Sequence, residues 1–492
     1  MQNTTPFLTG FSTLLSGKVK RTRQAQLRVQ RQQMIQDLPG GFCHQVREEI
    51  PAEFIEARCQ SVRKRVCPNT VTFWAFLSQV LAEDGSCSRT VSRMQAWMRA
   101  KGLEVPSAST ASYVNARQQQ PESMLQDVHQ HLCEQLERQL FSQQLWRGLR
   151  VKAVDATSVQ APDTPANQVD FPQPSGQAPG CGFPVVQLVG LIDLSHGGLG
   201  DFSHGDIVTG ELRGYDQLEE YLRPGDLLLG DRLYSSYEVV ARLKASSVEF
   251  LGRNHQARKI DFRRGRKISA NERIVEWKKP RQQPGKSRLP PEEWEQLPAS
   301  MSIRIIRTKV RNREGKIQTR YVITTLLDAQ FYPADEVASL YHHRWEIELR
   351  FRDIKTTMGM EMLRTKSPSM LRKEMLMHLI VYNLIRLLML KAAHHGRVSH
   401  RRISFKGLLQ ALEETAAGFE GHGNHPRILQ RERQNLYARI AERIVAYRPG
   451  RNEPRKKKRR PKSYGWLQRP RHEYFAHFPN PEPPARILDE AA

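Results

Sequence analysis

Apolar residues recur at helical spacing in the first third of the chain and predict a small helical module over residues 70–120. Phe73, Phe76 and Leu77 lie three or four positions apart, as on the buried face of an amphipathic helix. Gly/Ser-rich turns separate this helix from two further helical segments. Short helices joined in this way indicate either a DNA reader of the helix-turn-helix kind or a plain helical bundle.

Four arginines of this module are expected to point outward, and they are Arg89, Arg93, Arg99 and Arg117. An outward basic face would suit contacts to DNA phosphates, but it would equally suit a solvated surface. The same two interpretations apply to the basic segment 17–33, which is predicted to be helical. The pattern alone leaves both interpretations open.

After a helical stretch near 122–145 the pattern changes to short β-branched runs, which predict strands. The predicted elements are a strand at 150–159, a strand at 183–194 entering a Gly-rich hairpin turn, a strand at 225–231, a helix, and an extended segment at 248–253. This succession predicts a mixed α/β core with at least one strand-helix-strand unit.

A Lys/Arg/Pro/Gln-rich stretch and two further predicted strands then form a β-rich block, after which Pro333 is expected to begin a helix. The most apolar stretch, near 374–393, is interrupted by His378, Asn383 and Arg386. It therefore predicts a buried core helix and no membrane span.

The charge balance narrows the class of partner. The chain has 76 Lys and Arg against 51 Asp and Glu, a formal net charge of +25, and the excess is spread over most of its 492 residues. Such a protein attracts polyanions, although an anionic membrane surface or a ribosome would fit as well. The 6 cysteines are scattered without metal-ligand spacing, which indicates a reduced, cytosolic chain without structural zinc.

The stretch YHHRWEIELRFRDIK, residues 341–355, places one glutamate among cations on a predicted helix. At 100° per residue Tyr341, Arg344, Glu348 and Lys355 share a stripe about 60° wide that borders the apolar face. A surface ladder of salt bridges would explain this stripe. Further carboxylates that converge on Glu348 would instead indicate a metal site.

Two aspartates are candidates for that convergence, because each lies near the end of a predicted strand. Asp155 is in VDATS, and Asp231 follows LLLG at an end that delivers residues to the ligand crevice of α/β sheets. Each also has a structural explanation, Asp155 as a turn former and Asp231 as a helix N-cap. Asp193 competes with Asp155 for the first position.

Taken together, these motifs resemble a known family. Tyr341, Arg344, Glu348 and Lys355 match the Y-(2)-R-(3)-E-(6)-K signature of bacterial DDE transposases of the insertion-sequence-four type, and VDATS and LLLGDRLY resemble the segments that carry its two aspartates. The intervals of 76 and 117 residues between the three carboxylates also fit, with a β-rich insertion in the second. The resemblance covers about residues 70–395.

The resemblance implies a ribonuclease H-like α/β core, interrupted by the β-rich insertion and flanked by helical N-terminal and C-terminal regions. It implies that Asp155, Asp231 and Glu348 are catalytic and bind two divalent ions, Mg²⁺ or Mn²⁺. Tyr341, Arg344 and Lys355 would then contact DNA phosphates. Some relatives stack a flipped base on a tryptophan of the insertion, and Trp294 is the candidate here, with Trp277 as the second.

The implied function is a DNA transposase that cleaves at inverted-repeat ends and transfers the 3′-hydroxyl into target DNA, acting as a homodimer in the bacterial cytoplasm on the nucleoid. The alternatives are a nuclease of the same fold that does not join strands, and a non-catalytic DNA-binding protein derived from a transposase. The expected regions are a helical DNA-binding region at 1–121, the core at 122–253 and 331–395, the insertion at 254–330, and a basic C-terminal region at 396–492 with its cationic run at 454–462.

Overall fold

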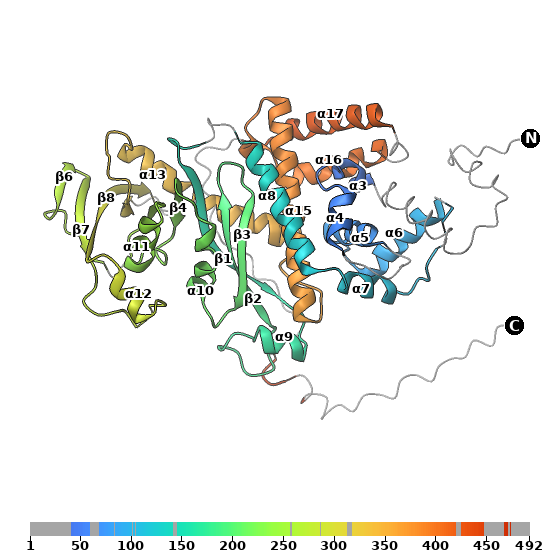
Figure 1. Cartoon of the computed structure of the whole chain (residues 1–492), viewed down its shortest axis with the longest axis horizontal. Helices are drawn as coiled ribbons and strands as arrows, with labels where there is room; N and C mark the ends of the chain where they lie inside the picture. The colour runs from blue at the N-terminus through green and yellow to red at the C-terminus, as the bar shows by residue number, and fades with distance from the viewer. Residues whose placement is uncertain are drawn as a thin grey trace, which may run out of the picture.

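The computed structural model describes residues 41–59, 68–82, 84–100, 102–103, 105–140, 145–255, 258–285, 287–311, 317–419, 425–446, 467–470 and 473. The basic segments at 17–33 and 454–462 lie outside these residues. A single mixed sheet runs through the middle of the molecule, with helices on both faces and a helical region at one end (Figure 1).

The sheet has nine strands in the order β3-β2-β1-β4-β5-β9-β8-β7-β6. The strands are β1 (Arg150–Gln160), β2 (Val185–Asp193), β3 (Leu199–Asp206), β4 (Asp226–Gly230), β5 (Glu249–Arg253), β6 (Arg266–Ser269), β7 (Glu272–Lys278), β8 (Ser300–Arg311) and β9 (Ile317–Thr324). β4 pairs in parallel with both β1 and β5, and the other pairs are antiparallel. This is the mixed α/β, ribonuclease H-like core that the sequence predicted.

The two faces of the sheet bury different helices because side chains alternate along each strand. From β1, Val151 and Ala153 join the main core with α8 (Glu122–Arg138) and α15 (Pro368–Gly396), whereas Val154 faces the opposite side. That side is covered by α10 (Glu211–Asp216) and α11 (Tyr237–Ala245).

The longest helix of the described residues, α15, is a core helix. By length and composition it could cross a membrane, but 94% of its most apolar window is buried inside the protein. Two of its polar interruptions, Asn383 and Arg386, donate to backbone carbonyls of the β2–β3 hairpin. Asn383 Nδ2 donates to the carbonyl of Leu199 at 2.8 Å, and Arg386 Nη2 donates to the carbonyl of His196 at 2.9 Å.

The predicted helical module is present as α5 (Asn69–Leu81), α6 (Cys87–Ala100) and α7 (Ala111–Gln118), preceded by α3 (Gly41–Val46) and α4 (Ala52–Arg58). Arg89, Arg93 and Arg99 are exposed, as expected. The prediction that Arg117 points outward is wrong, because it is only 6% exposed. Its guanidinium donates to Gln79 Oε1 at 2.9 Å and lies over the Phe76 ring, so it is part of the module's interior.

The β-rich block is continuous with the core sheet, because β9 pairs with β5 and carries β8, β7 and β6 with it. The remaining elements are α9 (Pro165–Asp170), η2 (Glu219–Tyr221), α12 (Pro291–Gln296), α13 (Ala334–His342), α14 (Trp345–Arg352), the π-helix η3 (Asp353–Thr357), η4 (His400–Arg402), α16 (Phe405–Phe419) and α17 (Pro426–Glu442). α16 and α17 pack near the N-terminal helices and α15 (Figure 1).

Candidate active site

Asp155 and Asp231 lie at neighbouring positions of the sheet. The parallel pairing of β1 with β4 ends at Ala153 and Leu229, so each aspartate comes two residues after the last paired residue of its strand. Ala153 and Leu229 both face the main core, and side chains two residues apart share a face. The register thus brings the two carboxylates together on one face, at the point where β4 has ended and β1 continues alone with β2.

The competing local roles of these aspartates are not observed. Asp155 lies inside β1, opposite Gly190, and forms no turn. Ser236 is the N-cap of α11, where its hydroxyl accepts from the Val239 amide at 3.2 Å. Asp231 Oδ1 instead accepts from the Leu233 amide at 2.6 Å, which fixes the start of the loop after β4.

The third carboxylate comes from α14, which packs on β1 through the buried side chains Ile347 and Phe351. Glu348, one residue from Ile347, accepts from Arg344 Nη2 at 2.9 Å, the spacing expected within a helix. Arg344 Nη1 also donates to Asp155 Oδ2 at 3.2 Å, 189 residues away in the chain. One guanidinium therefore bridges two of the three predicted site carboxylates.

The predicted single helix over 341–355 is wrong, because the chain forms three segments there. Tyr341 lies at the end of α13, Arg344 is the N-cap of α14, and Lys355 lies in the π-helix η3. The break does not separate Tyr341 from the site. Burial raises the pKa of the Tyr341 phenol, and both Arg344 and Asp231 are close enough to contribute to that pKa. Lys355 is half-buried beyond Glu348.

Burial raises the pKa of Asp155, and Arg344 opposes that rise while Asp231 and Glu348 add to it. Burial alone would lower the pKa of Arg344, but Tyr341, Asp155 and Glu348 reverse the shift and raise it. Asp155 and Glu348 thus share the cation Arg344, with the side chain of Asp155 20% exposed and that of Arg344 13% exposed. Since a poorly solvated excess of negative charge is costly, the site favours the arrival of further cations.

The donor set fits a hard divalent ion, because Asp155, Asp231 and Glu348 offer only carboxylate oxygens, the ligands that Mg²⁺ and Mn²⁺ prefer. However, the side chains of Asp155 and Glu348 are oriented by their hydrogen bonds to Arg344. Within the described ranges, no three His, Cys, Asp or Glu side chains converge as they would around a bound ion. The guanidinium of Arg344 therefore occupies the position between Asp155 and Glu348 where a metal ion would bind.

A group of cations beside the carboxylates was not found from the sequence. Burial lowers the pKa of Arg253, at the end of β5, and the neighbouring Arg232, Arg320 and Arg344 lower it further. A partly buried arginine whose pKa is lowered by neighbouring cations favours an anion beside it, such as a phosphate. The sequence could have indicated Arg253, because it ends the predicted strand that follows the strand before Asp231, and the two strands are neighbours in the sheet.

The inner side of α14 is held by a second set of charges that sequence reasoning also missed. Glu346 pairs with His343 at 2.7 Å and with Arg350 at 3.3 Å. Burial would raise the pKa of Glu346, but His343, Arg401 and Arg350 outweigh it and lower the pKa to about 2. These contacts fix the rotation of α14 and hence the direction of Glu348.

The placement of the tryptophans does not support the predicted base platform. Trp294 lies on α12 and is only 6% exposed, so its ring is enclosed by the insertion and offers no face to a base. Trp277 is half-buried, with the Arg258 guanidinium 3.4 Å above its ring and Tyr237 against its edge. The DNA-contact prediction for Trp294 is therefore corrected, since a flipped base needs an open aromatic face.

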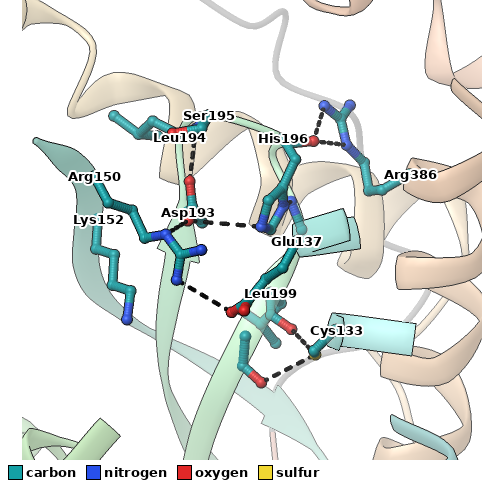
Figure 2. A network of polar contacts seen from close by, with 12 residues as sticks. Cys133, Glu137, Arg150, Lys152, Asp193, Leu194, Ser195, His196, Leu199 and Arg386 are labelled. Carbon is teal, nitrogen blue, oxygen red and sulfur yellow. Dashed lines mark hydrogen bonds and ion pairs between the residues drawn. The ribbon is translucent and has the colours of Figure 1, made fainter. Parts of the chain in front are cut away.

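Asp193, the rival of Asp155, belongs to a buried polar network at the end of the β1–β2 pairing where Lys152 faces it, three residue pairs from Asp155. Figure 2 shows it among Arg150, Ser195 and His196. Its Oδ1 accepts from the Ser195 amide at 2.7 Å, and its Oδ2 lies 3.4 Å from Arg150 Nε and 3.6 Å from His196 Nε2. These partners occupy both oxygens, so Asp193 stabilises the hairpin turn and does not join the site.

The sequence of this chain is similar to those of known transposases. A family model described as the transposase DDE domain matches residues 146–384, a range that contains Asp155, Asp231 and Glu348. The chain is also 28% identical over 348 residues to the transposase InsG for insertion sequence element IS4 of Escherichia coli K12, covering 69% of this chain and 74% of that protein. The chain is thus similar to the transposase DDE domain over residues 146–384, and over 69% of its length to a transposase of an insertion sequence element.

Proposed function

We propose that this DNA transposase hydrolyses one strand at each inverted-repeat end of its element and joins the freed 3′-hydroxyl to target DNA. The hydrogen bonds of Arg344 to both Asp155 and Glu348, which come from distant segments, carry the proposal, together with the place of Asp231 at the end of the strand beside β1. Asp155, Asp231 and Glu348 would hold two divalent ions, Mg²⁺ or Mn²⁺. When bound, such ions supply Lewis acidity that makes water or a hydroxyl a usable nucleophile near neutral pH.

The protein's own residues would hold the DNA for both steps. Arg344 exchanges its carboxylate partners for a backbone phosphate, and Tyr341 and Lys355 contact phosphates on either side of the scissile bond. In the first step a P–O bond to the 3′-oxygen breaks and water supplies the hydroxyl of the new 5′-phosphate. In the second step the freed 3′-hydroxyl attacks a target phosphate and releases another 3′-hydroxyl. No covalent bond to the protein is needed.

Cleavage and joining can be measured together on DNA that carries the ends of the element, with Mg²⁺ present. Asp231→Ala and Glu348→Ala should abolish both products, while Glu220→Gln, an exposed carboxylate of η2, should retain them. Either active-site variant cutting as well as wild type would refute the assignment. Cutting without joining by the wild type would instead make the protein a nuclease of this fold.

The predicted assembly is a homodimer that holds two ends, in the bacterial cytoplasm on the nucleoid. The mass of the protein–DNA complex, measured by light scattering with end DNA, tests this part separately. One protein copy per end with two ends in one particle is the expected composition.

A further inference from the structure

The outward arginines of the helical module belong to one helix, α6. Arg89, Arg93 and Arg99 of this helix are exposed, whereas Arg117 of α7 is buried. The sequence of α6 contains no Asp or Glu. The helix lies on the outer side of the module, at the end of the molecule opposite to the β-rich block (Figure 1). The basic face is therefore a property of α6, and it is far from the elements that carry the candidate active site.

The three arginines of α6 have no anionic partner in the part of the chain that the structure describes. None of their guanidiniums forms an ion pair there. The surface of α17 is different, because Arg439 and Arg443 both pair with Glu414, at 3.4 and 2.6 Å. A row of cations that the protein does not neutralise attracts a polyanion, whereas a solvated helix surface commonly pairs its charges.

Small side chains accompany the arginines on this face. Ser88, Ser92 and Ala96 are exposed and follow one another at intervals of four residues, so they form a row along the helix. Arg89 and Arg93 form a second row beside it. The major groove of B-DNA admits an α-helix, and small residues let the helix backbone approach the floor of the groove while guanidiniums reach base edges. The face of α6 therefore has the shape and the charge that suit a DNA groove.

The helix α6 is held firmly from its inner side. It is buried in a small core shared with α5 and α7, through Val91, Met94 and Met98. Gln79 Nε2 of α5 donates to the carbonyl of Gly85 at 2.8 Å, in the turn before α6. Lys373 Nζ of α15 donates to the carbonyl of Gln118, at the end of α7, at 2.7 Å. The module is thus attached to the catalytic core, so DNA bound by α6 would lie at a defined place relative to the carboxylates.

We propose that α6 is the recognition helix that reads the inverted-repeat DNA in its major groove. In helix-turn-helix proteins the residues near the N-terminus of the recognition helix contact base edges, so Arg89 and Arg93 would contact guanines. Arg99, in the last turn, would contact a phosphate. The helix α5 and the turn with Gly85 correspond to the first helix and the turn of this motif. The inference rests on the proposed function, because it assumes that inverted-repeat ends are the DNA that the protein must find.

Fluorescence anisotropy of the full-length protein in EDTA tests the inference, because it measures binding without cleavage. The probes are a labelled duplex that carries one inverted-repeat end and a scrambled duplex of the same length and base composition. Arg93→Ala should weaken binding of the end duplex about tenfold or more and that of the scrambled duplex only about twofold to threefold. Arg99→Ala should weaken both duplexes alike. Arg427→Ala, which removes an exposed arginine of α17, is the matched control and should change either affinity less than about twofold.

Thermal unfolding shows that each variant is folded, and the preference of the wild type for the end duplex separates the two levels of the argument. If the wild type prefers the end duplex and Arg93→Ala keeps that preference, α6 does not read bases and the inference is overturned while the proposed function stands. Equal weakening of both duplexes by Arg93→Ala also overturns it, since that result indicates phosphate contact alone. No preference by the wild type would count against both the proposed function and the inference. Loss of the preference in Arg93→Ala, with Arg427→Ala unchanged, supports the recognition helix.

Discussion

Asp155 and Asp193 lie on the same pair of strands, yet their surroundings differ in kind. Asp193 has three buried or partly buried partners, which are the Ser195 amide, Arg150 and His196. Asp155 shares its cation, Arg344, with Glu348, and it lies beside further carboxylates that raise its pKa. About three residues, or roughly 10 Å of strand, separate the two environments.

The comparison teaches how a structural carboxylate differs from a functional one when both are buried. In the network of Figure 2 Arg150 pairs with both Asp193 and Glu137, so these charges are compensated within the protein and need no ligand. At the site Asp155 shares Arg344 with Glu348, and the charges of Asp231 and Glu348 raise its pKa, so the carboxylate of Asp155 is only partly compensated. Such an imbalance costs stability, and a site tolerates it where a ligand supplies the missing charge.

The largest difference should appear in DNA cleavage. Asp155→Asn should lower the rate at least about 10³-fold, roughly 4 kcal/mol of transition-state stabilisation, because an amide replaces a ligand of the ions. Asp193→Asn, assayed at a temperature where it is folded, should cleave within about tenfold of wild type. Equal losses in the two variants would erase the distinction between the two aspartates.

The stability of the fold should respond in the opposite order. Asp193→Ala leaves Arg150 and the Ser195 amide without their acceptor, and it should lower the free energy of unfolding by about 3 kcal/mol. Urea unfolding of the metal-free protein measures this loss. Glu220→Ala, which removes an exposed carboxylate, is the matched control and should change stability by less than about 0.5 kcal/mol. If Asp193→Ala unfolds like the control, the network is not structural.

Acid should destabilise the fold through the buried His129, which contacts α15. Burial lowers the pKa of His129, whose Nε2 lies 3.1 Å from Asn383 Nδ2, to about 4. Between about pH 6.5 and pH 4 His129 is protonated in the unfolded chain but stays neutral in the folded protein. The free energy of unfolding therefore decreases as the pH falls through this range. The slope should be about 1.4 kcal/mol per pH unit for this group. His129→Gln should flatten the pH dependence of urea unfolding by that amount, and an unchanged slope would contradict a neutral buried His129.

The smallest effect concerns the cation that the site already holds. Arg344→Gln removes the competitor for Asp155 and Glu348, so Mn²⁺ should bind about two- to fivefold more tightly to the DNA-free protein. DNA binding should weaken in the same variant, because Arg344 is proposed to contact a phosphate. Weaker Mn²⁺ binding would show that Arg344 organises the carboxylates for the ion and does not compete with it.

The sequence predicted what depends on local pattern. The strands β1, β2, β4 and β5 and the helix α15 were each expected near their observed positions, because β-branched runs, turn residues and apolar periodicity determine them locally. The two aspartates were identified from their places at predicted strand ends. That they meet follows from the register of β1 with β4, which only the pairing of the strands establishes.

What the sequence left out depends on contacts between distant segments. Counting 100° per residue assumed one helix through Tyr341 and Lys355, and the break before Trp345 is invisible to that count. Arg117 resembled a surface arginine because nothing in its own segment shows that Phe76 and Gln79 enclose it.

Exchange of one ligand atom tests the central claim most directly. Asp155→Cys replaces an oxygen donor that suits Mg²⁺ with a softer thiolate that Mn²⁺ accepts more readily. If Asp155 binds the catalytic ions, this variant should cleave element-end DNA at a background rate in Mg²⁺ and recover measurable cleavage in Mn²⁺. Cleavage in Mg²⁺ at the wild-type rate would show that the Asp155 carboxylate is dispensable and would contradict the account.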